Sequence, residues 1–363
     1  MRGIELMVSE SKLLNNYNYF KALLEPTTKI LVALKANAYG LGDIEIGRVL
    51  EKFGVSYLAV AFPRIGIRLR EAGIKLPILI LTPGCESFPE LIEHNLEPSI
   101  INFFTLQKME EAATAAGVKG YPVHIKLDSG MQRVGFNEGE VQNLKELLKE
   151  SKSLKCASLF SHLAGAENRE HDLFTKGQIY LFEKMSDQII ETLGYSPLRH
   201  ILNSAGIERF AYGQFDMVRL GMGLYGTNFT ESQKVQIPFS LEAPVIHVRD
   251  TNHGSIGYGR VGRANPQGSR VVIVSGGYAD GISRALSNGK WSCLLNGVLV
   301  PTIGVINMDS FALDATGVDV KVGDNAIILN EQLTPSAMAK VLDTSPYEII
   351  ARMGVRIGRS IVP

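Results

Sequence analysis

The sequence predicts an α/β fold in which a (β/α)8 TIM-like barrel is followed by a mostly β C-terminal domain. Two observations support the barrel. The first part of the 363-residue chain alternates short apolar runs with amphipathic helical patterns, as parallel strands joined by helices do. Eight such units occupy roughly 225 residues, close to the usual size of this barrel. A third observation supports the second domain, because strand-like pieces with close Gly, Asn and Asp turns follow.

The barrel strands are predicted where short, mostly apolar runs are bounded by turn residues. They are Ile30–Leu34, Tyr57–Ala61, Pro77–Leu81, Glu97–Ile101, Val123–Leu127, Cys156–Ser161, His200–Asn203 and Met217–Arg219. Helical patterns such as Asp43–Phe53 and Val141–Ser151 separate most of them. A doubly wound sheet is the alternative, but no G-x-G-x-x-G motif follows the first strand.

The chain is expected to divide into a barrel domain at residues 1–229 and a mostly β domain at residues 230–363, with the junction at Thr227–Gln236. One helix, Pro335–Leu342, is predicted in the second domain. Its strands are expected at Leu241–Arg249, Arg270–Val274, Ser292–Leu295, Val298–Ile303, Ser310–Leu313 and Asn325–Leu329.

Composition and charge narrow the class of protein. Lys plus Arg and Asp plus Glu number 37 each, so no net basic field favours nucleic acid or a membrane surface. No apolar run approaches the roughly 20 residues that span a bilayer. The three cysteines are far apart and match neither a disulfide framework nor a zinc site. With no apolar signal-peptide core at the start, these features predict a cytoplasmic protein without a metal.

Lys35 stands where the first predicted barrel strand ends, and the glycine-rich turn of ILVALKANAYGLG follows it. A lysine entering a core must be neutralised or paired. Lys35 is therefore either a paired core lysine or a reactive amine. Reactive lysines form Schiff bases with carbonyl cofactors.

Other polar residues follow the remaining barrel strands, and the carboxyl ends of the strands form the working face of this fold. Each has a structural alternative: a core histidine for His162, an ion-pair partner for Arg219, and a helix cap for Asn203 and Ser204. Because all these residues are expected at the same mouth of the barrel, a functional site is favoured over separate structural roles. The residues concerned are Tyr39, Lys126, Asp128, Arg133, Ser161, His162, Asn203, Ser204 and Arg219.

Glycines after the last two barrel strands indicate an anion site. Ser204 begins the helix after the seventh strand, and Gly221–Gly223 follows the eighth. Phosphate sites in this fold are frequently built from these two loops, with backbone N–H groups as donors. A phosphate seat beside an amine, an imidazole and a guanidinium suggests pyridoxal 5'-phosphate.

Motifs along the whole chain resemble those of the alanine racemases, two-domain pyridoxal-phosphate enzymes of the barrel type. They agree with the family in order and spacing. They are VALKANAYGLG at 32–42, IKLDSGMQRVGF at 125–136, SHLAGAE at 161–167, HILNSAG at 200–206, DMVRLGMGLYG at 216–226, IGYG at 256–259, GGYADGISR at 276–284 and INMDS at 306–310.

The resemblance implies a role for each matching residue. Lys35 would carry the cofactor, and Arg219 would bond its pyridine nitrogen with His200 behind. His162 would lie against the cofactor ring and link to the catalytic tyrosine, and Asn203 would also bind the cofactor. The phosphate would be held by Tyr39, Ser204, Gly221 and Met222.

The resemblance also implies the groups that meet the amino acid. Tyr258 would be the second acid–base residue and would reach the barrel of the other subunit of a homodimer. Arg133 and the backbone of Met308 would orient the substrate carboxylate, with Asp309 beside them. Lys126 matches a lysine that can be carbamylated and then brace Arg133.

The expected reaction is interconversion of L- and D-alanine, supplying D-alanine for cell-wall peptidoglycan. Racemisation removes the α-proton on one face and returns it on the other, so two bases on opposite faces, Lys35 and Tyr258, suffice. Both have reference pKa values near 10, so each must be lowered to act near neutrality, and nearby cations do this.

The chain departs from the family pattern in three places, of which the first two lie near the substrate entrance and bear on substrate range. Ile361 stands where a family tyrosine narrows the entrance, and Val305 and Asn307 replace an arginine and a cysteine. Phe62–Gly66 lacks the usual acidic pair. A racemase of broader range, serine included, is therefore the first alternative. A non-catalytic pyridoxal-phosphate carrier is the second, but such carriers lack a β domain. A related decarboxylase would have a cysteine where Tyr258 stands.

Overall fold

The computed structural model describes residues 3–227, 229, 234–252 and 254–363, which form two compact units. One contains Leu14–Ala36 and Ile46–Val235, and the other contains the described residues of Met1–Leu13, Asn37–Glu45 and Gln236–Pro363. The boundary expected between residues 229 and 230 stays a prediction. The junction expected at Thr227–Gln236 lies partly outside the described residues.

The first unit is the predicted parallel barrel. Its strands lie in the order β9-β2-β3-β4-β5-β6-β7-β8, and every neighbouring pair is parallel. They are β2 (Lys29–Ala33), β3 (Tyr57–Val60), β4 (Ile78–Ile80), β5 (Glu97–Ile100), β6 (Tyr121–Lys126), β7 (Leu154–Phe160), β8 (Leu198–His200) and β9 (Met217–Leu220).

Backbone hydrogen bonds between the β8 and β9 segments close the barrel. The Asp216 N–H donates to the Arg199 carbonyl at 3.2 Å, and the Arg219 N–H donates to the Leu202 carbonyl at 3.0 Å. The second bond lies beyond the end of β8, so the predicted strand His200–Asn203 is shorter as an assigned strand although its backbone still pairs. Closure leaves no open edge on this sheet.

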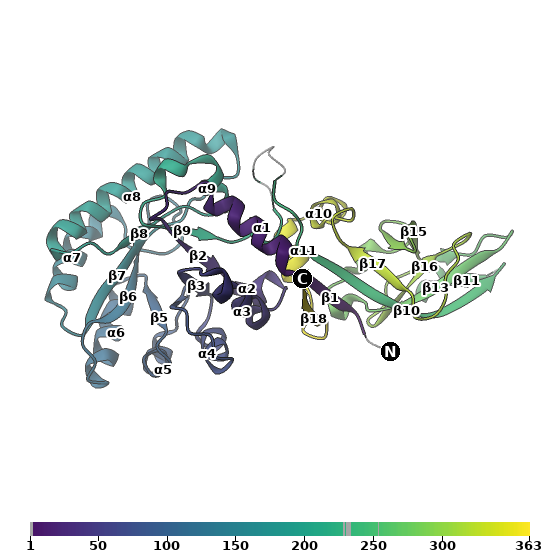
Figure 1. Cartoon of the computed structure of the whole chain (residues 1–363), viewed down its shortest axis with the longest axis horizontal. Helices are drawn as coiled ribbons and strands as arrows, with labels where there is room; N and C mark the ends of the chain where they lie inside the picture. Colours follow the sequence, from purple (N-terminus) through teal and green to yellow (C-terminus); the bar gives the residue numbers. More distant parts are fainter. Residues whose placement is uncertain (1–2, 228, 230–233, 253) are drawn as a thin grey trace. The chain divides into compact units, whose positions relative to one another are not determined.

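Helices alternate with the barrel strands along the chain, as Figure 1 shows from purple to teal. They are α1 (Glu10–Lys21), α2 (Lys35–Tyr39), α3 (Asp43–Phe53), α4 (Pro63–Glu71), α5 (Phe88–Glu93), α6 (Phe103–Ala115), α7 (Val141–Glu150), α8 (Asp172–Leu193) and α9 (Ser204–Arg209). Within the described ranges, no helix is both long enough and apolar enough to cross a membrane.

One half of the barrel interior is apolar. Leu31 of β2, Ala59 of β3, Leu79 of β4 and Met217 of β9 pack as one buried cluster. The strands on the other side, β5 to β8, carry buried polar side chains instead, including His124, Ser158 and His200. The interior is thus divided into an apolar half and a polar half.

The second unit is mostly β, as predicted. Its main sheet has the order β13-β16-β15-β14-β17-β10-β1-β18, and β11 pairs with β12 separately. The elements are β1 (Glu5–Ser9), β10 (Phe239–Thr251), β11 (Ser255–Ile256), β12 (Gly262–Arg263), β13 (Ser269–Ser275), β14 (Ser292–Leu295), β15 (Val298–Ile303), β16 (Ser310–Asp314), β17 (Asn325–Leu329), α10 (Pro335–Leu342), α11 (Pro346–Ala351) and β18 (Gly358–Val362).

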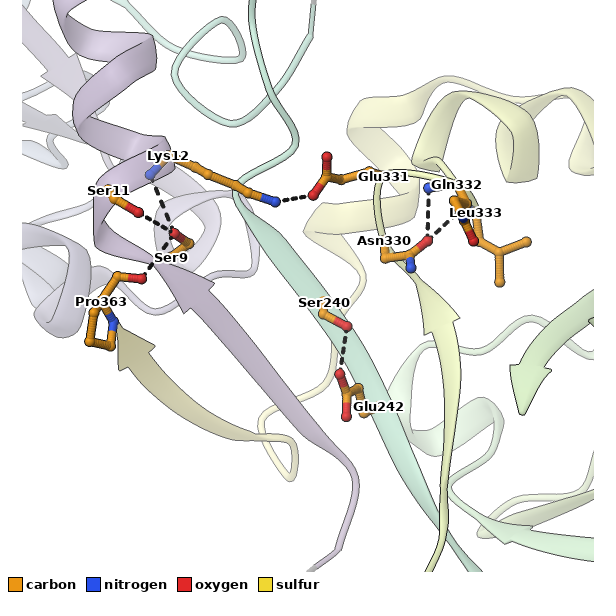
Figure 2. A network of polar contacts seen from close by, with 10 residues as sticks. All are labelled: Ser9, Ser11, Lys12, Ser240, Glu242, Asn330, Glu331, Gln332, Leu333 and Pro363. Atoms are coloured by element: carbon orange, nitrogen blue, oxygen red, sulfur yellow. Dashed lines mark hydrogen bonds and ion pairs between the residues drawn. The ribbon is translucent and has the colours of Figure 1, made fainter. Parts of the chain in front are cut away.

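The two ends of the chain meet in this sheet, a pairing that the sequence did not indicate. Strand β1 runs antiparallel to β10 and parallel to β18, with Leu6 opposite Leu241 on one side and Arg359 on the other. Figure 2 shows the side-chain contacts around β1. The Ser9 hydroxyl donates to the Pro363 carbonyl at 3.3 Å, and Lys12 pairs with Glu331.

Candidate active site

Lys35 follows β2 directly, at the carboxyl ends of the barrel strands. The residue is exposed there, so it is not a core lysine. Partial desolvation of its ammonium, followed by the charges of Arg133 and Arg219, lowers the pKa of Lys35. These neighbours favour the neutral amine, which is the nucleophilic and basic form.

The turn after Lys35 is left-handed. Residues 36–39 all have positive φ, from 50° at Ala38 to 59° at Asn37. This conformation costs about 1–2 kcal/mol for each non-glycine residue. Gly40 ends the turn at φ 91°, where a Cβ would lie 2.0 Å from the Ile350 carbonyl oxygen. The structure therefore holds a strained segment directly after the amine, as functional sites often do.

Arg219 is almost fully enclosed at the end of β9. Both terminal nitrogens of its guanidinium are hydrogen-bonded. Nη1 donates to His200 Nδ1 at 2.8 Å and to the His200 carbonyl at 3.0 Å. Nη2 has three acceptors that share its two protons, the Ser161 and Ile201 carbonyls at 2.6 and 2.9 Å and His162 Nδ1 at 3.0 Å. Among the described residues no hydrogen bond uses Nε–H, which leaves one fixed donor for a ligand.

The two histidines that contact Arg219 are neutral. Burial, and then the charge of Arg219, hold the pKa of His162 and of His200 well below the usual range. Because the guanidinium can only donate, each Nδ1 must accept. The remaining proton of each imidazole therefore sits on Nε2. For His162 this leaves an Nε2–H donor that Arg219 does not use.

Lys126 is buried at the end of β6, with its ammonium 5.1 Å from the centre of the Phe160 ring. Burial, and then the charge of Arg219, lower its pKa to about 7. Arg133 is exposed and forms no ion pair with a carboxylate in the part of the chain described. The structure therefore brings together Lys35, Lys126, Arg133, His162 and Arg219, as the sequence predicted.

The predicted anion seat has the expected backbone geometry. The Asn203 side chain caps α9 by accepting from the Gly206 N–H at 2.9 Å, so its structural interpretation is correct. The Ser204 hydroxyl accepts from the N–H groups of Gly221 and Gly223 at 3.0 and 3.2 Å. Met222 is buried beside them. The first N–H groups of α9 have no partner within the helix, and the Asn203 side chain accepts from one of them.

Three predicted residues belong to the second unit. Tyr39 is buried with its ring centre 6.4 Å from that of Tyr347. Burial, and then Tyr347, raise the pKa of Tyr39, so its phenol is protonated at neutral pH. Tyr258 and Met308 are exposed by 72% and 52% and line one hollow of about 530 Å³.

An ion-pair cluster holds the segment around Met308, and two of its members, Asp280 and Arg356, are not predicted from the sequence. Arg356 donates to Asp280 at 2.8 and 3.1 Å and to Asp309 at 2.7 Å. The Ala279 N–H donates to the Met308 carbonyl at 3.2 Å. Within the described residues the Met308 N–H donates to no protein group. Asp280 and Arg356 could have been noticed only through their pairing in space.

Comparisons with known proteins agree with this geometry over the whole chain. The family model for the alanine racemase N-terminal domain matches residues 8–229, and that for the alanine racemase C-terminal domain matches residues 238–361.

The chain belongs to the alanine racemase family. The alanine racemase of Thermodesulfovibrio yellowstonii is 33% identical over 371 residues, covering 99% of this chain and 98% of that protein.

Solved structures of alanine racemases have the same fold. The enzyme of Clostridium difficile 630 superposes with a TM-score of 0.93 at 32% identity, covering 100% of this chain and 96% of that one. The enzyme of Bartonella henselae, solved with covalently bound pyridoxal phosphate, superposes with a TM-score of 0.86 at 26% identity over 100% of both chains.

Proposed function

We propose that this protein interconverts L- and D-alanine with pyridoxal phosphate bound at the barrel mouth. The observation that carries the proposal is the group of cations around Lys35. They favour the neutral amine of Lys35 near the Arg219 guanidinium, whose terminal nitrogens are hydrogen-bonded. Membership of the alanine racemase family supports the reaction class. The product D-alanine would serve cell-wall peptidoglycan, and the protein would act in the cytoplasm as a homodimer.

The residues present fit this cofactor. Arg219 offers Nε–H, a donor with no protein partner among the described residues, toward the place of the pyridine nitrogen. The N–H groups at the start of α9 suit a phosphate. Lys35 would hold the cofactor covalently, and His162 would lie against its ring. Tyr39, Asn203, Ser204, Gly221 and Met222 would complete the site.

When bound, pyridoxal phosphate withdraws electrons from the α-carbon of the amino acid and so makes its α-proton more acidic. Lys35 would accept or return this proton on one face. Tyr258 would do so on the other face, from the partner subunit. A phenol exposed by 72% can meet a partner surface, which is the feature of Tyr258 that supports this role.

Positioning of the substrate carboxylate falls to Arg133 and the Met308 N–H. Both are donors with no acceptor among the described residues, so a carboxylate can bind them. Lys126, whose pKa is about 7, has a large neutral fraction near neutral pH. Its amine would add CO2 and release a proton, and the resulting carbamate would brace Arg133. Asp309 would act through Arg356 to hold Met308.

One observation keeps a broader substrate range as the second candidate. Val305 and Asn307 line the hollow that contains Tyr258, and the Asn307 Oδ1 atom is buried without a hydrogen-bond partner in the described chain. A buried unpaired acceptor favours a ligand that donates to it. A hydroxyl such as that of serine would do so.

A racemisation assay of the purified protein with added pyridoxal phosphate tests the proposal. Alanine, serine and larger amino acids are supplied as single enantiomers, and the optical form of the product is measured. We expect alanine to react fastest. Borohydride reduction in parallel should fix the cofactor to Lys35 and not to Lys126. The proposal is wrong if no amino acid is racemised, and the assignment of Lys35 is wrong if another lysine is labelled.

A further inference from the structure

A line of buried polar side chains crosses the polar half of the barrel behind Arg219. The Glu97 carboxylate lies 2.7 Å from His124 Nε2, and His124 Nδ1 lies 2.6 Å from the Ser158 hydroxyl. The same hydroxyl lies 2.9 Å from His200 Nε2. We call Glu97, His124, Ser158 and His200 the Glu97 relay. It connects β5, β6, β7 and β8 and ends on Arg219.

The strand register explains how these residues meet. His124 of β6 is opposite Ser158 of β7, so the two side chains lie next to each other across one ladder. His200 of β8 stacks on Phe160, two residues further along β7, with ring centres 5.1 Å apart and an interplanar angle of 8°. Because side chains alternate along a strand, Ser158 and Phe160 lie on the same face. Neighbouring strands therefore place all relay members in one continuous chain.

The direction of every hydrogen bond in the relay follows from its Arg219 end. Arg219 can only donate, so His200 Nδ1 accepts and His200 Nε2–H donates to Ser158. The Ser158 hydroxyl then has its own proton for His124 Nδ1. His124 Nε2–H in turn donates to the carboxylate. His200, Ser158 and His124 each accept on one side and donate on the other, the Glu97 carboxylate only accepts, and both imidazoles are neutral Nε2–H tautomers.

The opposite arrangement is excluded by its consequence at the Arg219 end. A charged His124 would donate from Nδ1 to Ser158, and the hydroxyl would then have to donate to His200 Nε2. His200 would carry its proton on Nδ1, facing an N–H of Arg219. Two donors would then face each other in a buried place, which costs about 1–3 kcal/mol for the unsatisfied group, and more for a charged group.

The relay also joins opposite charges. Arg219 is enclosed, and no carboxylate forms an ion pair with it among the described residues. Burial lowers the pKa of Arg219 to about 9. Glu97 is the carboxylate to which hydrogen bonds connect it, and the Tyr57 side chain also bonds to Glu97. Chains of hydrogen bonds polarise one another in a low-dielectric interior, so the negative end strengthens the acceptor that Arg219 uses.

We propose that the Glu97 relay positions Arg219 for the reaction. It keeps His200 Nδ1 an acceptor and so fixes the guanidinium through its terminal nitrogens, with Nε–H left as the donor for a ligand. Glu97, His124 and Ser158 are positioning residues, because none of them lies at the mouth. The inference deepens the proposed function and depends on the role that Arg219 has in it.

The tautomers are tested on the holoenzyme labelled with 15N-histidine. Long-range 1H–15N correlation spectra distinguish Nδ1–H, Nε2–H and doubly protonated rings, and single histidine substitutions assign the signals of the seven histidines. We expect His124 and His200 both to be Nε2–H. An Nδ1–H form of His200, or a doubly protonated His124, would overturn the relay. Because this measurement needs no catalysis, its outcome is independent of whether the protein is a racemase.

The positioning role is tested with Ser158→Ala, which interrupts the relay. Ser99→Ala is the matched control, because Ser99 is also a fully buried serine of a barrel strand and bonds only the Leu81 carbonyl, at 2.8 Å. Ser158→Ala should lower kcat by about 10–100-fold, the range known for outer-shell partners of ligating histidines. KM should change little.

The visible absorption band of the bound cofactor is a second readout of the same variants, because it reports the field at the pyridine nitrogen. It should shift in Ser158→Ala and in Glu97→Gln and stay in place in Ser99→Ala. If Ser158→Ala and Ser99→Ala had equal effects on kcat and on the absorption band, the relay residues would contribute only by packing, and the positioning role would be wrong. If the wild-type protein racemised no amino acid, the proposed function would be wrong. The 15N-histidine spectra would then still show whether the hydrogen bonds of the relay have the proposed directions.

Discussion

At the scale of single residues, the barrel mouth is a site with an excess of positive charge. The pKa values of Lys35, Lys126 and Arg219 are all lowered, chiefly by desolvation, and for the two lysines the charges of nearby arginines lower the pKa further. An anionic ligand would relieve this repulsion. The arrangement thus favours a phosphate and a carboxylate as ligands, and it keeps the amines reactive until they are bound.

Lys126 makes the stability of the apoprotein depend on pH. Its folded pKa of about 7 lies below the unfolded value of about 10.4, so the unfolded chain binds more protons between these limits. This group's contribution to stability therefore rises with pH across that window and is lowest below about pH 7. Relative to Lys126→Met, the free energy of unfolding of the wild type should rise by on the order of 1 kcal/mol per pH unit within this window.

Urea unfolding of both proteins at about pH 7 and about pH 9 measures this difference. Taking the difference between the two proteins cancels the titration of all other groups. An unchanged difference between the two pH values would mean that Lys126 stays charged in the folded protein.

At the scale of elements, the regular parts could be predicted and the long-range pairings could not. Apolar runs such as Ile30–Leu34 indicate barrel strands because burial on both faces requires them. By contrast, β1 is short and its partners are more than 200 residues away, so nothing local indicates them. The role of His124 in VHIKL was equally hidden in the sequence, because its partners come from β5 and β7, the strands on either side of β6.

The candidate site shows the same division. Residues at strand ends, such as Lys35 and Arg219, could be found because the fold assigns its working face to those positions. Asp280 and Arg356 could not, because their contact depends on the path of two loops. The left-handed turn after Lys35 was also missed, since four successive residues other than glycine in this conformation contradict local preference.

Gly277 gives an element-scale prediction for the Met308 segment. A Cβ at Gly277 would lie 2.2 Å from the Asn307 carbonyl oxygen and 2.4 Å from that of Met308. Both are backbone atoms, which cannot move aside as easily as the end of a flexible side chain. Gly277→Ala should therefore displace the Met308 N–H and raise KM for alanine, with little change in the cofactor absorption band.

Gly177→Ala is the control for this prediction. It lies inside α8 with nothing within 4 Å of the new Cβ, so it should stabilise the protein by about 0.5–1 kcal/mol and leave KM unchanged. Steady-state kinetics and thermal unfolding of the two variants measure these effects. An unchanged KM in Gly277→Ala would remove Met308 from the substrate site.

At the scale of the whole molecule, we propose that each site is shared between two chains. Lys35 and Tyr258 belong to different compact units, and Tyr258 is widely exposed. If each site takes Lys35 from one subunit and Tyr258 from its partner, a Lys35→Ala protein and a Tyr258→Phe protein should complement each other. A mixed dimer would contain one site with both residues intact and one with neither.

Subunit exchange tests this sharing. The two inactive variants, carrying different affinity tags, are mixed, and the doubly tagged dimer is isolated and assayed. Activity should return to about half of the wild-type value per dimer, since one of two sites is intact. Isolated mixed dimers without activity would mean that each site is built within one chain.

The central claim is that Lys35 and Tyr258 act on opposite faces of the α-carbon, and Tyr258→Phe tests it most directly. The substitution removes one oxygen and keeps the ring. Loss of a general acid–base group lowers rates by about 10²–10⁴-fold, so racemisation in both directions should fall by this order.

The decisive measurement is exchange of the α-proton with solvent deuterium in this variant, followed separately for each enantiomer by NMR. Because Lys35 remains, exchange should survive for D-alanine, whose proton Lys35 would remove, and be lost for L-alanine. That asymmetry is what the two-base account predicts. Equal residual exchange with both enantiomers would contradict it, because a single mobile base would then serve both faces.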